Sequence, residues 1–220
     1  MNNSDASVRE VFLARHRTGH DLPTSHFLKV RECARPALRP GQVRVRNDFL
    51  QLTAVMADLM TEKPGLPMPA YAVGEPLWGG AVGTVVESAA GLPAGTVVQH
   101  MNGWREECTG DASRFYPVPV GLPGAEYVLN QGVTAYHGMA QVAAVGEGDV
   151  VFVSGAAGGV GSLAGQIAKA LGARTVIGSA GSPEKVKYIV DELGFDAGIN
   201  YREGLVRERL AELAPEGIDV

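Results

Sequence analysis

The chain has 220 residues, enough for one large domain or two small ones with a sizeable hydrophobic core. Hydrophobic residues make up 45% and charged residues 20%, as in ordinary soluble globular proteins, and the formal net charge is -5. This acidic balance gives no basic face for nucleic acid, and no apolar run is long enough to span a bilayer, so we expect neither partner.

The two cysteines, Cys33 and Cys108, lie far apart in the sequence. Their separation excludes a disulfide framework and a metal-ligand spacing, and it fits a reducing compartment. The first residues lack the apolar run of a signal peptide. We therefore expect a cytoplasmic protein without a metal site.

Short β-like runs separated by proline and glycine fill the first half of the chain. Strands are predicted at Phe27–Val30, Gln42–Val45, Gly83–Glu87 and Thr96–His100. Many short strands broken by turns indicate a small barrel or sandwich. The pattern changes near residue 125, so we predict two domains, residues 1–125 and 126–220.

Strands and helices alternate in the second half. Strands are predicted at Asp149–Ser154, Arg174–Gly178 and Ala197–Asn200, helices at Val160–Leu171, Ser182–Leu193 and Leu205–Leu213, and the start of a fourth strand at Ile218–Val220. The apolar first strand is typical of a parallel sheet that is buried on both faces. This series predicts the first half of an α/β, doubly wound Rossmann domain.

A glycine cluster, GAAGGVG at residues 155–161, lies between the first strand and the first helix of this series. Ala156, Gly158 and Gly161 have the dinucleotide-binding spacing, with alanine at its first position. Gly158 would let a pyrophosphate approach the backbone, and Gly161 would let the helix pack close to the strand. The free N–H groups and the dipole at the helix start favour an anion. The alternative is a tight turn that binds nothing, for which bulkier residues would serve.

The end of the second strand indicates which cofactor binds. NAD sites usually have an acid about 20 residues past the glycines, where it bonds the ribose hydroxyls. Here no acid precedes Glu184, so a 2′-phosphate would meet no repulsion. Lys185, Tyr201 and Arg202 could reach this place. We therefore expect NADP(H) rather than NAD(H), with a solvated helix lysine as the alternative role of Lys185.

Four segments together resemble the zinc-independent medium-chain dehydrogenase/reductase superfamily, in its prostaglandin reductase or alkenal/one oxidoreductase branch. They are NQGVTAYHG at 130–138, the glycine segment at 153–173, GSAGSPEK at 178–185 and NYR at 200–202. The resemblance implies a GroES-like, β-rich N-terminal domain before the Rossmann domain. It also implies an NADPH site that uses Gly158, Lys185 and Tyr201, with Thr134 near the nicotinamide.

The full set of predicted cofactor contacts is Gly155, Ala156, Ala157, Gly158, Gly159, Val160, Gly161, Ser179, Ala180, Lys185, Tyr201, Thr134 and Asn130. The reaction implied by the resemblance is hydride transfer from NADPH to the β-carbon of a small, apolar α,β-unsaturated carbonyl or quinone-like substrate. The open alternative is a descendant of the fold without reductase activity, which binds a nucleotide without turnover or catalyses a cyclisation or dehydration.

The sequence departs from the family pattern at the active site. Trp78-Gly79-Gly80 and Asn130 stand where zinc-dependent relatives carry metal ligands, and neither supplies a thiolate or an imidazole. Residues 53–57, TAVMA, replace the branch's Asp-Pro-Tyr-Met-Arg segment, so the cleft becomes more apolar. We expect Met56, Tyr71 and Trp78 to line it.

No general acid or base can be assigned to this reaction, because conjugate reduction needs little beyond alignment and polarisation of the carbonyl. A ribose hydroxyl or water can supply the proton. Tyr71 is the side chain to test as a catalytic residue, whereas Tyr136 lies in an apolar helical stretch and is predicted to be core.

The family continues past Val220, and an unpaired first strand at Val150–Val153 would be an exposed apolar edge. We therefore expect a missing C-terminal segment, a second chain that completes the sheet in a homodimer, or a remodelled self-associating protein.

Overall fold

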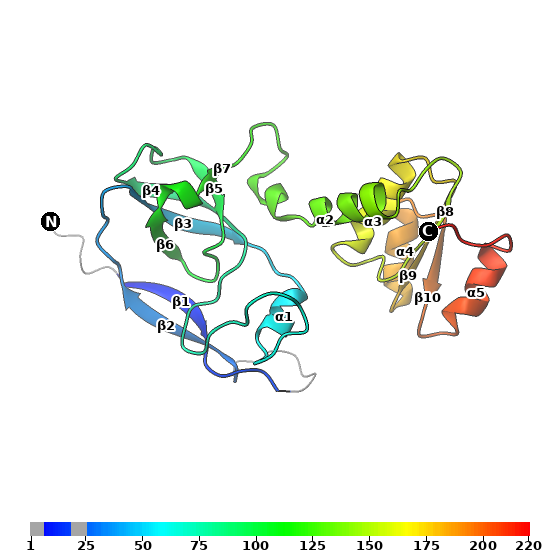
Figure 1. Ribbon diagram of the computed structural model, residues 1–220, viewed down its shortest axis with the longest axis horizontal. Coiled ribbons are helices and arrows are strands. Elements are labelled where there is room, and N and C mark those ends of the chain that lie inside the picture. The colour runs from blue at the N-terminus through cyan, green and yellow to red at the C-terminus, as the bar shows by residue number, and fades with distance from the viewer. Residues whose placement is uncertain (1–6, 19–25) are drawn as a thin grey trace. The chain divides into compact units, whose positions relative to one another are not determined.

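A computed structural model describes residues 7–18 and 26–220 of the chain (Figure 1). Its contacts divide the chain into two compact units, Met1–Leu129 and Asn130–Val220. No helix among the described residues combines the length and apolar character that crossing a lipid bilayer requires.

The first unit is built from antiparallel strands. β1 (Ser7–Leu13) pairs with β2 (Leu28–Ala34), and a second sheet has the order β6-β3-β4-β5-β7. That sheet contains β3 (Gln42–Leu50), β4 (Ala81–Ser88), β5 (Val97–His100), β6 (Glu107–Asp111) and β7 (Tyr116–Pro117). The helix α1 (Val55–Leu59) lies between β3 and β4, the 3-10 helix η2 (Ala112–Arg114) lies between β6 and β7, and the 3-10 helix η3 (Ala125–Leu129) follows β7.

The inward faces of these strands form the core of the larger sheet. Val43, Val45, Val85 and Val98 are almost fully buried and pack with Cys108 and Phe115. Burial alternates along β5, where Val98 and His100 are buried and Val97 is exposed. Side chains two residues apart face the same side of a strand, so this alternation directs one face to the core.

Each of the four strands predicted in this half corresponds to an observed strand. Phe27–Val30 corresponds to β2, Gln42–Val45 to β3, Gly83–Glu87 to β4 and Thr96–His100 to β5. The sequence analysis missed β1, β6 and β7. In β1, SVREVFL, charged and apolar residues do not alternate cleanly, so no strand period is visible. Contacts with distant segments hold it instead: the Arg31 guanidinium donates to the Glu10 carboxylate at 2.6 Å, and Arg9 pairs with Glu106.

The second unit is a parallel α/β layer structure. β8 (Val150–Val153), β9 (Thr175–Ala180) and β10 (Ala197–Asn200) form a sheet of order β10-β9-β8. The helices are α2 (Gly132–Tyr136), which continues as the π-helix η4 (His137–Val142), α3 (Gly161–Ala170), α4 (Pro183–Asp191) and α5 (Val206–Leu213). Ser182 caps α4 by accepting a hydrogen bond from the Lys185 backbone N–H, as the sequence predicted.

Helices cover this sheet on both faces. One core cluster joins Val151, Val153 and Val176 to residues of α3 and α4, and the other joins Val150, Ile177 and Ile199 to the apolar side of α5. Alternate residues of the same strands therefore face two cores, which is why β8 is apolar throughout. The predicted α/β class, a β-rich first part followed by a partial Rossmann sheet, is confirmed.

The segment Ile218–Val220 lies along the edge of β8 that β9 leaves free. The Phe152 N–H donates to the Val220 carbonyl at 2.8 Å, and the Asp219 N–H donates to the Val150 carbonyl at 2.9 Å. The Val150 N–H in turn donates to the Asp219 carboxylate at 2.9 Å. The expected exposed edge is thus partly covered, at the position that the strand order predicts for a fourth strand.

Candidate functional site

The glycine cluster forms a tight turn between β8 and α3. Gly155 has φ +59°, a conformation that side chains other than hydrogen disfavour. Its carbonyl accepts the Gly158 N–H at 2.9 Å, while the Ala156 N–H donates to the Ser179 carbonyl of β9 at 2.9 Å. A Cβ on Gly161 would lie 2.9 Å from the Ala156 Cα and closer still to the Gly155 carbonyl oxygen. Only glycine therefore allows this approach of helix to strand.

The outer side of the turn is open and presents backbone donors. A Cβ on Gly158 would meet only the Gly155 carbonyl oxygen, at 3.1 Å. Among the described residues, no acceptor takes up the N–H groups of Gly159, Val160 or Gly161. α3 has no side-chain cap and no acid in its first turn. Unpaired N–H groups at the positive end of a helix favour an anion, so the turn fits a cofactor diphosphate.

The predicted adenosine side lies at the carboxyl ends of β9 and β10. Ser179 and Ala180 are buried, and the Ala180 carbonyl accepts the Tyr201 N–H at 3.1 Å. The Tyr201 ring covers Gly181, where an added Cβ would lie 2.8 Å from the ring Cζ. Tyr201 as a whole is 48% exposed, so it remains accessible from solvent next to Gly181.

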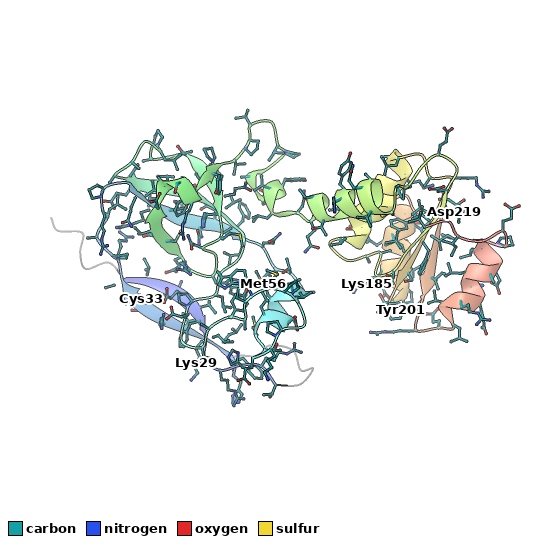
Figure 2. All side chains as sticks on the ribbon, viewed as in Figure 1. Lys29, Cys33, Met56, Lys185, Tyr201 and Asp219 are labelled. Atoms are coloured by element: carbon teal, nitrogen blue, oxygen red, sulfur yellow. The ribbon has the colours of Figure 1, made fainter. Side chains whose placement is uncertain are left out.

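Lys185 lies in the first turn of α4, exposed to solvent, at the same end of the sheet as Tyr201 (Figure 2). Its ammonium forms no ion pair with any residue in the described part of the chain. The nearest acid in sequence, Glu184, interacts with the Ser182 hydroxyl at the start of α4, which lowers the pKa of its carboxyl. Lys185 is therefore free to meet a phosphate.

The two predicted contacts from the start of the unit differ in what they can offer. Asn130 uses its side-chain oxygen to accept the Gly132 N–H at 2.7 Å, which fixes the start of α2. Thr134 is exposed on α2, with no hydrogen bond from its hydroxyl to another described residue. Tyr136, expected in the core, is 54% exposed, so that expectation was wrong. The apolar stretch buries Ala135 instead, because only one side of this helix packs against α3.

The candidates in the first unit lie in a packed cluster. Tyr71 is 2% exposed, and its hydroxyl donates to the Trp78 carbonyl at 2.8 Å. The centroids of the Tyr71 and Trp78 rings lie 5.0 Å apart, and Met56 is also buried in this cluster. Burial raises the pKa of Tyr71 to about 12. To protonate a substrate Tyr71 would first have to leave this hydrogen bond, so the geometry favours packing over catalysis for this residue.

A hollow of about 510 Å³ lies elsewhere in the first unit. It is lined by Gln51, Gly80, Gln99, His100, Met101, Asn102, Arg114, Tyr116, Val128 and Leu129. Met56, Tyr71 and Trp78 do not line it. Sequence reasoning missed Gln51 and Arg114 because they come from segments far apart in the chain, and only the strand pairing brings them together.

His100 and the cysteines are not placed as ligands or nucleophiles. His100 is 4% exposed, its ring packs at a tilt against Phe115, and its Nδ1 accepts the Asn102 N–H. Burial lowers the pKa of His100 to about 4. Burial also raises the pKa of the Cys108 thiol to about 12. Within residues 7–18 and 26–220, no group of three or more His, Cys, Asp or Glu side chains could hold a metal ion.

Two sequence families match the chain. Residues 9–118 match the family described as the N-terminal domain of oxidoreductase, and residues 159–220 match the family described as zinc-binding dehydrogenase. The first match falls on the β-rich unit, and the second begins inside the glycine turn and continues through α3, β9, α4, β10 and α5.

Individual relatives match over nearly the whole chain. The NADP(+)-dependent 2-alkenal reductase of Nicotiana tabacum is 33% identical over 98% of this chain and 65% of its own length. Prostaglandin reductase 1 of Mus musculus is 33% identical over 94% of this chain and 62% of its own. The crystal structure of CurA from Vibrio vulnificus in complex with NADPH has a TM-score of 0.86 at 31% identity, covering 96% of this chain and 63% of that one. The chain thus spans less than two thirds of each of these relatives.

Proposed function

The chain belongs to the medium-chain dehydrogenase/reductase superfamily, in the branch of the prostaglandin and alkenal reductases, and on this premise we propose that it binds NADPH and reduces α,β-unsaturated carbonyl compounds. The relatives' names support both parts of the proposal, since one is an NADP(+)-dependent 2-alkenal reductase and another was crystallised with NADPH.

The observation that carries the proposal is the open glycine turn. The N–H groups of Gly159, Val160 and Gly161 have no acceptor among the described residues, and they lie where α3 begins. A diphosphate placed there would receive backbone hydrogen bonds and the favourable end of the helix dipole. Because Gly158 lacks a Cβ, its backbone leaves room for the diphosphate to approach.

We assign the discrimination between NADPH and NADH to the positive charge of Lys185. A 2′-phosphate on the adenosine ribose would meet the Lys185 ammonium, with the Tyr201 ring beside it. Hydrogen bonds that involve a charged group contribute more than neutral ones. A cofactor without that phosphate gains nothing from Lys185, so we expect NADPH to bind more tightly than NADH.

The chemistry in the proposal asks little of the protein's own side chains. When bound, the reduced nicotinamide supplies the hydride that adds to the β-carbon of the acceptor. The chain's part is to fix the cofactor through the turn and to hold an apolar acceptor in line. Thr134, whose hydroxyl has no partner in the described part of the chain, is proposed to meet the nicotinamide side, as the resemblance implies. Water or a ribose hydroxyl can deliver the proton.

Calorimetric titration with NADPH and with NADH tests the cofactor assignment. We expect Lys185→Ala to weaken NADPH binding by about 10-fold or more while leaving NADH binding unchanged, because one charge-assisted bond to phosphate is lost. Lys187→Ala is the matched control. Lys187 is also exposed on α4, but it lines a hollow between α4 and β10 to which Lys185 does not contribute. Equal affinity of the unchanged protein for the two cofactors would refute the assignment.

A second measurement tests turnover. NADPH absorbance should fall when a simple enone or enal is added, and the product should carry a saturated bond between the α- and β-carbons. Binding of NADPH without any loss of absorbance across a panel of enones, enals and quinones would contradict the proposed reaction while leaving the cofactor site intact.

A further inference from the structure

Two neighbouring amide side chains at the start of the second unit have different surroundings. The Asn130 side chain turns back onto α2 and accepts the Gly132 N–H at 2.7 Å. The Gln131 side chain reaches the glycine turn instead: a Cβ on Gly159 would lie 2.8 Å from its Oε1, 3.1 Å from its Cδ and 3.5 Å from its Nε2. The carboxamide of Gln131 therefore lies directly against the backbone of Gly159.

This carboxamide is uncommitted. In the described part of the chain, neither its oxygen nor its nitrogen makes a hydrogen bond, whereas the Gln131 backbone carbonyl accepts the Ala135 N–H at 3.1 Å. The backbone bond holds the residue at the start of α2 and leaves its side chain free. An amide group carries two N–H donors, and rotation about its last bond exchanges the positions of oxygen and nitrogen.

We propose that Gln131 is a further cofactor-binding residue, whose side-chain amide donates a hydrogen bond to the cofactor diphosphate held over Gly159. The inference rests on the proposed function, because it requires a diphosphate at the turn. It assigns to Gln131 the role that the sequence prediction gave to Asn130, whose side chain is already occupied at the start of α2.

The position suits a neutral donor. The turn already offers the N–H groups of Gly159, Val160 and Gly161, and a side-chain amide beside Gly159 adds a directed donor without introducing a charge. It also gives Gly159 a reason to be glycine, since a methyl group there would displace the Gln131 side chain. Gln131 thus acts on the diphosphate, whereas Lys185 acts on the 2′-phosphate, so the two contributions are separable.

The test compares Gln131→Met and Gln131→Glu with the unchanged chain, by calorimetric titration of NADPH and of adenosine 2′-monophosphate, which has no diphosphate. Met keeps the length of the side chain but removes its donors, and we expect about 5-fold weaker NADPH binding. Glu keeps the shape but sets a negative charge beside the diphosphate, and we expect about 10-fold or greater weakening. Neither change should affect adenosine 2′-monophosphate, whereas Lys185→Ala should weaken both ligands.

Gln166→Glu is the matched control, because it adds the same charge to an exposed position of α3, where the Gln166 side chain bonds only the Ser162 carbonyl. Unaltered NADPH affinity in both Gln131 variants would overturn this inference, and so would an equal loss for adenosine 2′-monophosphate. Failure of the unchanged chain to bind NADPH would instead overturn the proposed function. Circular dichroism of each variant checks that the second unit is folded.

Discussion

The two units hold their predicted site residues in opposite ways. In Asn130–Val220, the residues of the glycine turn offer backbone groups outward, and few of their side chains matter. In Met1–Leu129, Met56, Tyr71 and Trp78 offer side chains to one another and close the space between them. In the described chain, the backbone groups of the glycine turn are open to solvent, whereas the side chains of the other cluster pack together as a core.

This contrast has a physical reason. A backbone site requires glycine at positions where a Cβ would block either the ligand or the close packing of the turn. Apolar side chains pack together wherever they can, because burial removes their surface from water. Substrate-lining residues of an apolar cleft therefore look like core residues, and the same sequence features predict both.

The largest expected effect comes from the turn. Gly161→Ala places a methyl 2.9 Å from the Ala156 Cα and closer to the Gly155 oxygen, both backbone atoms that cannot rotate away. We expect the free energy of unfolding of the second unit to fall by about 3 kcal/mol. Urea titration monitored by helical circular dichroism measures this loss.

Gly158→Ala is the matched change at the same turn. Its methyl would meet one oxygen at 3.1 Å and otherwise open space, so stability should fall by less than about 1 kcal/mol while NADPH binding weakens strongly. If Gly158→Ala costs as much stability as Gly161→Ala, the turn is not open on its outer side and the contrast between the two units fails.

The second effect belongs to the core of the first unit and depends on pH. Burial, and secondarily the positive charge of Arg105, lowers the pKa of His100 to about 4, from the ordinary histidine value of 6.5. Between these values the unfolded chain takes up a proton that the folded chain refuses. The His100 contribution to stability is therefore complete above about pH 6.5 and falls by up to about 3 kcal/mol as the pH drops to about 4.

Urea midpoints across this pH range measure that loss. Both tryptophans, Trp78 and Trp104, belong to the first unit, so their fluorescence reports on its unfolding. His100→Phe should flatten the pH dependence relative to the unchanged chain, because the remaining acids titrate alike in both proteins. Parallel pH profiles of the two proteins would show that His100 is not the group responsible.

The sequence predicted most of the second unit and its turn, because apolar strands, helix periods and glycine spacing are all local features. Ser182 as a cap and Gly161 as a close-packing residue were confirmed on that basis. It missed β1, β6 and β7, which pair with strands distant in the sequence, and the carboxamide of Gln131, whose place beside Gly159 is visible only in the folded chain. No periodicity reports which of two adjacent amides is already bonded.

The smallest effect tests whether Tyr71 belongs to a core or to a site. Tyr71→Phe removes the hydroxyl that donates to the Trp78 carbonyl at 2.8 Å, leaving that carbonyl without this donor in a buried cluster. We expect the free energy of unfolding of the first unit to fall by about 1 kcal/mol, as measured by tryptophan fluorescence during urea titration. If the tyrosine serves packing alone, kcat for an enone stays unchanged and only the urea midpoint shifts. A fall in kcat of about 100-fold at an unshifted midpoint would instead restore Tyr71 as a proton donor, because general acid catalysis contributes on that scale.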